Sequence, residues 1–196
     1  MDQLPPYTAL VLAGGRAARL GGQAKPQLEV GGRSMLATVL GAVADAERRI
    51  VVGPPQPVPG DVAVVREHPP GGGPVAALRA GLPSVRTEVV AVLAGDLPFL
   101  TAGLIAELRA GLTDDGVLVV DETGRDQLLV GVWRTAALRD VLPDGDGPTA
   151  LRRVLAPLTT TRLRPTVAPG TPPPWLDCDT PADLARARAI AGDGRG

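Results

Sequence analysis

Lys25 is the only lysine in the chain, and it lies in a glycine-rich segment at residues 12–28. The compact ammonium group of lysine reaches a phosphate as a point charge, and the planar guanidinium group of arginine is not equivalent to it. Backbone N–H groups of adjacent glycines can also approach an anion closely. The segment contains both kinds of group, namely Gly14, Gly15, Arg16, Arg19 and Lys25. This combination suits a triphosphate, and the alternative is a flexible surface loop.

Lys25 does not belong to a Walker A loop. It is preceded by Ala24 rather than glycine and followed by Pro26 rather than serine or threonine. The segment also lacks the spacing G-x-G-x-x-G. However, it directly follows the apolar run at residues 9–13, and ligands of open α/β sheets bind outside the carboxyl ends of the strands. Its position is therefore right for a binding site.

Asp96 is the second candidate, because it follows a continuous apolar run at residues 89–93 with Gly95 beside it. A carboxylate at a strand end is a suitable ligand for Mg²⁺, which nucleotide sites hold with one or two carboxylates, phosphates and waters. The alternative is that Asp96 caps a turn ahead of Pro98.

Asp177 and Asp179 form a third candidate just before the last predicted helix. If this stretch is extended, two side chains at this spacing point to the same face. They could ligate a metal, or Asp179 or Thr180 could simply cap the helix.

The glycine run at residues 71–73 leads into another predicted helix. Backbone without side chains can lie flat against a nucleobase, and the alternative is a mobile linker. The single histidine, His68, stands beside two prolines and is expected in a loop. With one histidine, the chain has no multi-histidine metal site, and any hydrolase triad that needs a histidine would have to use His68.

Composition limits the class of protein. The chain has 196 residues, 44% apolar content and a net charge of −1, which is typical of one soluble domain. Aromatic residues make up 2%, so few rings could stack on bases, and nucleic-acid binding is not expected. The sole cysteine, Cys178, cannot form an internal disulfide. No apolar run is long enough for a membrane span or signal peptide, so a cytoplasmic protein is expected.

Short apolar runs alternate with helical patterns, which indicates a mostly parallel sheet covered on both faces. Strands are predicted at residues 9–13, 49–52, 62–65, 89–93 and 117–120, with 128–133 and 160–164 added at an edge. Helices are predicted at residues 34–46, 74–82, 101–112 and 180–191. We expect one domain at residues 7–192 between tails at residues 1–6 and 193–196.

Together these residues resemble the nucleotidyltransferases that transfer a nucleoside monophosphate to a phosphorylated acceptor, and among them the molybdenum cofactor guanylyltransferase family. The resemblance spans nearly the whole chain. The family motif L-A-G-G-x-x-x-R-[ML]-G-x-x-x-K is matched from Leu12 to Lys25. Residues 71–77 resemble its GGPLAG segment, and residues 94–98 resemble its AGDxP segment. The implied fold is a Rossmann-like three-layer sandwich of the nucleotide-diphospho-sugar transferase type.

The resemblance implies a role for each matched residue. Leu12, Ala13, Gly14 and Gly15 would contact the guanine, with Gly73 and the acidic residue Glu67 beside it. Arg19 and Lys25 would bind phosphates, and Asp96 would bind Mg²⁺ together with Asp179 or Asp177. Arg19, Lys25 and Asp96 would be the catalytic residues.

The sequence departs from the family pattern at three places. Ala24 stands where an acid is usual, Asp179 where an asparagine is usual, and Gly53 lies near a position where the family has an asparagine that contacts the base. A carboxylate at position 179 can still ligate magnesium. Residues 124–127 resemble the pterin-side stretch loosely and lack its proline.

The implied reaction transfers GMP from GTP to the terminal phosphate of molybdopterin and releases pyrophosphate. The product would be passed to molybdoenzyme apoproteins or their chaperones. Two other enzymes remain open, a cytidylyltransferase acting on the same pterin and a sugar-1-phosphate nucleotidyltransferase. A third alternative is a non-catalytic nucleotide-binding module that delivers the cofactor.

Overall fold

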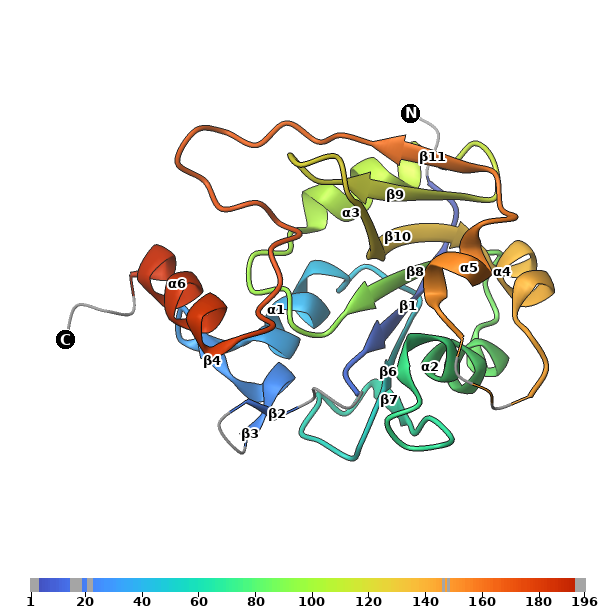
Figure 1. Ribbon diagram of the computed structural model, residues 1–196, viewed down its shortest axis with the longest axis horizontal. Helices are drawn as coiled ribbons and strands as arrows, with labels where there is room; N and C mark the ends of the chain where they lie inside the picture. The colour runs from blue at the N-terminus through green and yellow to red at the C-terminus, as the bar shows by residue number, and fades with distance from the viewer. Residues whose placement is uncertain (1–3, 15–18, 21–22, 146, 148, 193–196) are drawn as a thin grey trace.

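A seven-stranded sheet forms the centre of the molecule (Figure 1). The computed structural model describes residues 4–14, 19–20, 23–145, 147 and 149–192. In spatial order, the strands are β11 (Thr160–Leu163), β9 (Gly116–Val120), β10 (Asp126–Arg134), β8 (Val89–Ala94), β1 (Tyr7–Leu12), β6 (Arg48–Val52) and β7 (Val62–Val65). All neighbouring pairs are parallel except the two that β10 makes with β8 and β9. The predicted mostly parallel α/β sheet is confirmed.

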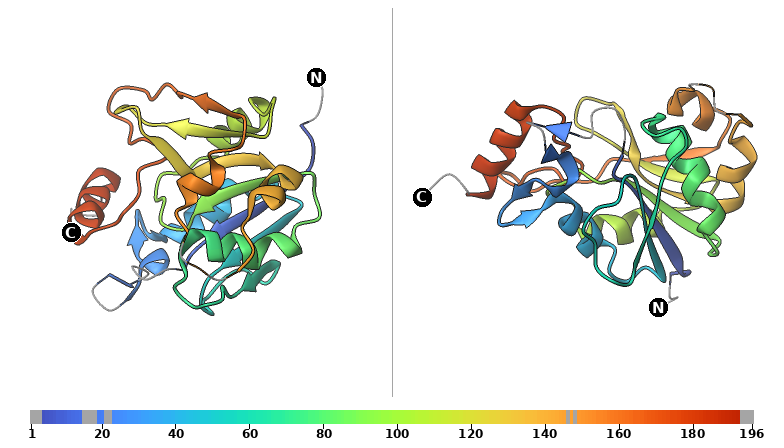
Figure 2. Two further views of the ribbon diagram at one scale, coloured as in Figure 1. Left: turned by 45° about the vertical axis from the view of Figure 1, so that its right-hand side comes forward. Right: turned by 90° about the horizontal axis from the view of Figure 1, so that it is seen from below.

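Helices cover both faces of the sheet, as the two turned views in Figure 2 show. On one face lie α1 (Met35–Ala42) and α3 (Ala102–Ala110), which pack on the alternate strand residues Ala9, Val11 and Ala91. On the other face lie α2 (Gly73–Gly81), α4 (Thr135–Val141) and α5 (Leu151–Leu155), with η2 (Leu82–Ser84) after α2. Successive side chains of a strand point to opposite faces, so the continuous apolar runs supply both cores.

The helix starts follow from local hydrogen bonds. The hydroxyl of Thr101 accepts from the backbone N–H of Leu104, and this N-cap begins α3 as predicted. Thr180 caps α6 (Pro181–Ala191) in the same way, and Asp183 completes a capping box. The predicted helix at residues 34–46 is shorter, because Val43 leaves the helical conformation after α1.

The strand at residues 128–133 was predicted at an edge, and this was wrong. It forms part of β10, which lies in the interior between β8 and β9. The short connection from β9 at Val120 to β10 at Asp126 makes these strands antiparallel neighbours, and β10 then pairs with β8 as well. Of the two strands predicted at an edge, β11, at residues 160–163, does occupy one. The helices α4 and α5 were not predicted.

A small third cluster lies beside the sheet. It joins α6 to η1 (Lys25–Gln27) and to the hairpin of β4 (Glu29–Val30) and β5 (Arg33–Ser34). Its buried residues are Leu28, Val30, Met35, Cys178, Leu184 and Ala187. This satellite cluster fixes the segment before α6 against the segment after Lys25. Within the described residues, no helix is long and apolar enough to span a bilayer.

Candidate active site at the carboxyl edge of the sheet

Three strand ends are joined by backbone hydrogen bonds just beyond the sheet. Ala13 donates to the carbonyl of Val52 at 2.8 Å, and Gly95 donates to the carbonyl of Leu12 at 2.9 Å. These bonds hold the chain after β1 between the ends of β6 and β8. The motif residues that follow each strand therefore meet at one edge, as predicted for an open α/β sheet.

Two glycines permit this close approach. A Cβ atom on Gly53 would lie 2.9 Å from both the carbonyl carbon and the oxygen of Ala13. A Cβ atom on Gly95 would lie 3.1 Å from the Cβ of Ala13. Gly53, which stands near the position of the family's base-contacting asparagine, is thus required by backbone packing here.

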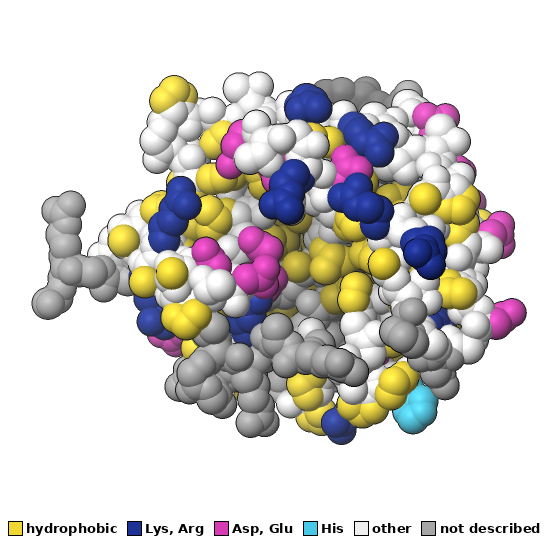
Figure 3. Space-filling view, in the orientation of Figure 1, with side chains coloured by type: hydrophobic (Ala, Val, Ile, Leu, Met, Phe, Trp, Pro, Cys, Tyr) yellow, Lys and Arg dark blue, Asp and Glu magenta, His cyan; other side chains and the backbone are white. Residues whose placement is uncertain are grey.

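A cavity of about 260 Å³ opens at this edge. Figure 3 shows the hollow, with an apolar floor, acidic side chains at its left and basic side chains along its upper side. The cavity is lined by Leu12, Ala13, Gly14, Lys25, Pro26, Glu67, Gly73, Pro74, Ala77, Ala94, Gly95, Asp96, Leu129 and Asp179. Every described residue that the sequence nominated for nucleotide binding lines it, apart from Arg19, whose side chain is not described.

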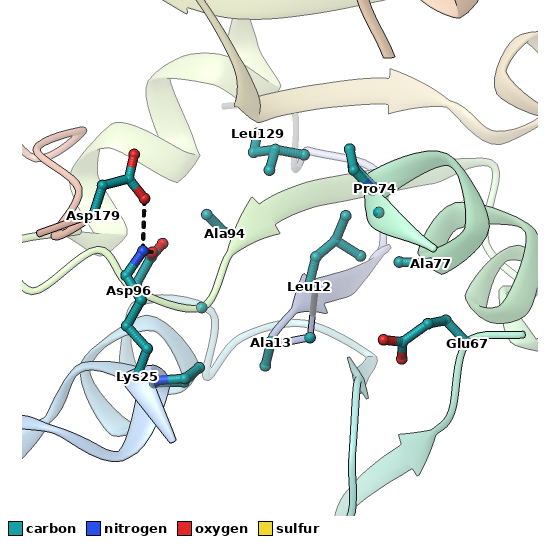
Figure 4. A pocket seen from close by; sticks show the side chains of 14 residues that line it. Leu12, Ala13, Lys25, Glu67, Pro74, Ala77, Ala94, Asp96, Leu129 and Asp179 are labelled. Atoms are coloured by element: carbon teal, nitrogen blue, oxygen red, sulfur yellow. Dashed lines mark hydrogen bonds and ion pairs between the residues drawn. The ribbon is translucent and has the colours of Figure 1, made fainter. Parts of the chain in front are cut away.

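Lys25 lies between two carboxylates at one end of this cavity (Figure 4). Its Nζ atom is 2.8 Å from Oδ2 of Asp96 and 2.6 Å from Oδ1 of Asp179. The Lys25 side chain is 6% exposed, whereas that of Asp179 is 66% exposed. Asp96 thus forms an ion pair with Lys25. The capping alternative is confirmed for Thr180, which caps α6, and Asp179 is free of that role.

Lys25 is held in its charged form. Burial acts to lower the pKa of the Lys25 ammonium, but its hydrogen bonds to Asp179 and Asp96 outweigh that effect and raise the pKa above its ordinary value. Lys25 therefore carries a full positive charge throughout the neutral pH range and cannot serve as a general base there.

Asp177 lies near the two carboxylates that hold Lys25. Desolvation, together with the negative charges of Asp179 and Asp96, raises the pKa of Asp177 to about 6. Asp177 and Asp179 both line a second cavity of about 330 Å³. This cavity shares Pro74, Ala94, Asp96, Leu129 and Asp179 with the first. The expectation that Asp177 and Asp179 face the same space is confirmed.

Glu67 lies at the opposite end of the first cavity from Lys25, with Leu12 and Ala13 between them (Figure 4). The residue is 5% exposed. Its Oε1 atom accepts a hydrogen bond from the backbone N–H of Gly71 at 3.2 Å, while its buried Oε2 atom has no partner among the described residues. A buried acceptor without a partner is costly, which makes Oε2 a strong candidate for binding a ligand.

Glycines shape this end of the cavity. A Cβ atom on Gly14 would lie 2.6 Å from Oε1 of Glu67, so a side chain at position 14 would collide with the carboxylate. Gly73 has a φ of +83° and begins α2, and a left-handed backbone favours glycine at this position. The glycine run is thus a helix start rather than a linker, while His68 lies exposed in the preceding loop as predicted.

For two predicted binding residues, the side chain or the whole residue is not among those that the structure describes. Gly15 lies outside the described residues. The backbone of Arg19 pairs with Ala24 in a small hairpin of β2 (Arg19–Leu20) and β3 (Gln23–Ala24), but its side chain is not described.

The second cavity includes Leu128 and Leu129, which the sequence did not indicate, beside Gln127, the last residue of the stretch that loosely resembles the family's pterin side. Between Gln127 and Gly131 the pairing of β10 with β9 shifts, so that three residues of β10 bulge away from the ladder. The bulge places Leu128 and Leu129 on the second cavity, beside Gln127. Gln127 is oriented by Asp121, which accepts a 2.8 Å hydrogen bond from its amide nitrogen.

The donor set at the shared boundary suits Mg²⁺. Asp96 and Asp179 already converge on one cationic nitrogen, and Mg²⁺ requires only one or two carboxylates when a substrate supplies phosphate oxygens. In the described part of the chain, no group of three or more acidic, histidine or cysteine side chains could hold a metal alone. The geometry fits a metal that is held jointly with a nucleotide.

The fold and this edge define the class of protein, a nucleotidyltransferase with a Rossmann-like α/β sheet. Residues 9–164 match the family model of the MobA-like NTP transferase domain. The chain belongs to this family. It is 30% identical to the molybdenum cofactor guanylyltransferase of Bradyrhizobium sp. (strain ORS 278), over 93% of this chain and 92% of that protein. It is also 30% identical to the molybdenum cofactor guanylyltransferase of Rhodopseudomonas palustris (strain BisB5), covering 97% of each.

Solved structures share the fold. Molybdopterin-guanine dinucleotide biosynthesis protein A from Archaeoglobus fulgidus superposes with a TM-score of 0.71 at 17% identity, covering 95% of this chain and 99% of that one. The 2-C-methyl-D-erythritol 4-phosphate cytidylyltransferase from Thermus thermophilus superposes with a TM-score of 0.65 at 21% identity, again covering 95% and 99%. Similarity at this level of identity supports the architecture alone.

Proposed function

We propose that this protein transfers GMP from GTP to the terminal phosphate of molybdopterin, or of the molybdenum cofactor, and releases pyrophosphate. One observation carries the proposal: the cavity has an unpartnered acceptor, Glu67 Oε2, at one end and a lysine with two carboxylates at the other. The first end suits a base that donates hydrogen bonds, and the second suits a triphosphate with its metal. The names of the two relatives supply the pterin acceptor.

Glu67 favours guanine over cytosine. A carboxylate only accepts hydrogen bonds, and guanine offers adjacent N–H donors on its N1 and 2-amino groups. Cytosine offers only its 4-amino group as a donor on the corresponding edge, beside the acceptors N3 and O2, so it lacks the pair of adjacent donors that guanine presents to a carboxylate. The backbone from Leu12 to Gly14 and Gly73 would hold the rest of the base, and the resemblance to the family gives Gly15 the same role.

Lys25 and Arg19 would neutralise the triphosphate, while Asp96 with Asp179 or Asp177 would hold Mg²⁺. When bound, Mg²⁺ would offset charge on the phosphates. The acceptor's phosphate oxygen attacks the α-phosphorus, and pyrophosphate leaves, so no protein nucleophile is required. Positioning and charge stabilisation dominate such transfers, which this arrangement of fixed charges would supply.

The second cavity is the natural place for the acceptor. It meets the first at Asp96, Asp179 and Leu129, which is where the α-phosphate and the attacking oxygen must come together. Its apolar floor from the β10 bulge suits a flat heterocycle. The amide of Gln127 offers both a donor and an acceptor, and its orientation is fixed by Asp121.

Pyrophosphate release tests the function. The purified protein is given GTP or CTP with Mg²⁺, in the presence and absence of molybdopterin, and Asp96→Asn is the matched inactive control. Release that needs both GTP and molybdopterin supports the proposal. Preference for CTP would make the protein a cytidylyltransferase, and release with a sugar 1-phosphate instead of molybdopterin would make it a sugar nucleotidyltransferase. GTP binding without any release would favour a non-catalytic module that delivers the cofactor.

A further inference from the structure

The Lys25 ammonium occupies the space between the two carboxylates that are best placed to hold a metal. Its Nζ atom contacts Asp96 and Asp179 at 2.8 and 2.6 Å, respectively. The ammonium is almost completely buried and touches one oxygen of each carboxylate, so it occupies the position that a bound cation would take. A divalent ion on the same two oxygen atoms would meet a like charge at short range, which is strongly unfavourable in a partly desolvated site.

The backbone around Lys25 is fixed while its side chain can change partners. Lys25 begins η1, and its carbonyl accepts a 3.1 Å hydrogen bond from the backbone N–H of Leu28. Leu28 is in turn anchored in the satellite cluster with α6. The four-carbon stem of a lysine has several rotatable bonds, so the ammonium can turn from carboxylate to phosphate without movement of the chain.

We infer that Lys25 closes the metal site of the ligand-free protein and that the triphosphate opens it by drawing the ammonium away from Asp96 and Asp179. The inference rests on the proposed function for the identity of the triphosphate. The carboxylates then become available to the cation that accompanies the nucleotide. The metal therefore binds only weakly before the nucleotide, and it enters the site with the nucleotide or after it.

Metal binding without nucleotide tests this order. Mn²⁺ alone is titrated into the protein and followed by electron paramagnetic resonance. Wild-type protein is expected to bind it at least tenfold more weakly than Lys25→Met. Arg188→Met is the charge-matched control, because it also removes one positive charge, but from an exposed position on α6, where Arg188 donates to the carbonyl of Glu29. It should bind Mn²⁺ like the wild type.

Two results of this titration would overturn the inference. One is equal Mn²⁺ affinity of wild type and Lys25→Met. The other is tight Mn²⁺ binding by the double variant Lys25→Met, Asp96→Asn, which would place the ion elsewhere. Neither result depends on which nucleotide the protein uses, so failure of GTP specificity in the pyrophosphate assay remains a separate outcome.

A second measurement needs no variant, and it covers the case in which Lys25→Met does not fold. Because the chain has one lysine, ¹⁵N-lysine labelling gives a single side-chain ammonium signal. Mg²⁺ alone should leave this signal unchanged, and GTP with a chelator should shift it. A shift with Mg²⁺ alone, or no shift with GTP at a concentration that calorimetry shows to be saturating, would contradict the exchange of partners.

Discussion

Lys25 and Asp179 are 154 residues apart in the chain, and a 2.6 Å hydrogen bond joins their side chains. The contact is possible because the satellite cluster holds α6 against the hairpin of β4 and β5. One end of the candidate site therefore combines an N-terminal loop, the end of the central strand β8 and a C-terminal segment. Substitutions at this junction can test the effects of side-chain charge and side-chain shape separately.

Lys25→Arg is expected to lower pyrophosphate release at least about 100-fold, which corresponds to about 2.7 kcal/mol in transition-state stabilisation. The ammonium fills a buried position between two carboxylates, and the larger planar guanidinium cannot take the same place or reach the phosphates as a point charge. Lys25→Ala should be at least as inactive. Steady-state rates with circular dichroism as a check on folding would measure this, and near-normal turnover by either variant would refute the role of Lys25.

Glu67→Gln is expected to weaken GTP binding by about tenfold or more while leaving the ligand-free protein at least as stable. Hydrogen bonds to charged groups contribute about 1.5–3 kcal/mol, and the neutral amide loses that contribution to the base. It also removes a buried charge whose Oε2 atom lacks a partner in the described structure. Calorimetry with GTP and thermal melting without it would measure the two effects. Unchanged GTP affinity would show that Oε2 does not contact the base.

Gly53→Ala is expected to destabilise the fold by about 1–3 kcal/mol, the usual cost of overpacking. The added Cβ would press on the backbone of Ala13, which cannot move without breaking its hydrogen bond to Val52. Gly60→Ala is the matched control, since a Cβ there meets nothing within 4 Å. Urea denaturation should separate the two variants, and equal midpoints would contradict the packing argument.

Asp121→Asn is expected to lower the melting temperature at pH 7 and to have less effect in acid. Hydrogen bonds from the backbone N–H of Arg125 and from Thr123 lower the pKa of Asp121 to about 2. Because this value is below that of the unfolded chain, near 3.9, the ionised carboxylate stabilises the folded state above about pH 5. The contribution is lost as pH falls toward 2. The melting temperatures of the wild type and Asp121→Asn should converge as the pH is lowered from 7 to 2.5. A difference that stays constant would exclude a contribution from ionisation of Asp121.

Much of the architecture could be predicted because the central strands β1, β6 and β8 are apolar runs closely followed by glycine. Tyr7–Leu12 and Val89–Ala94 are buried along nearly their whole length, and such runs are typical of a parallel sheet with helices on both faces. The interior place of β10 was missed because pairing order is a property of the whole sheet. The short helix α5 has too few residues to show a clear period.

The site was predictable where a residue lies just beyond the end of a strand, as Gly14 does after β1 and Asp96 after β8. The meeting of Lys25 with Asp179 could not be read from spacing, because it depends on how α6 packs on the satellite cluster. Two further features could not be predicted from the sequence: the unpartnered oxygen of Glu67 and the bulge that places Leu129 between the two cavities. Both result from tertiary packing, which a local sequence pattern does not determine.

The long sequence separation between Lys25 and Asp179 also has a consequence for synthesis of the protein. The central strands up to β8 can pair while the chain is still being made, whereas the contact with Asp179 must wait until the last helix has left the ribosome. Until then Lys25 has only Asp96 of this pair available, and the satellite cluster lacks the half supplied by α6. The nascent protein can thus pass through a stage in which the central strands are paired and the candidate site is incomplete.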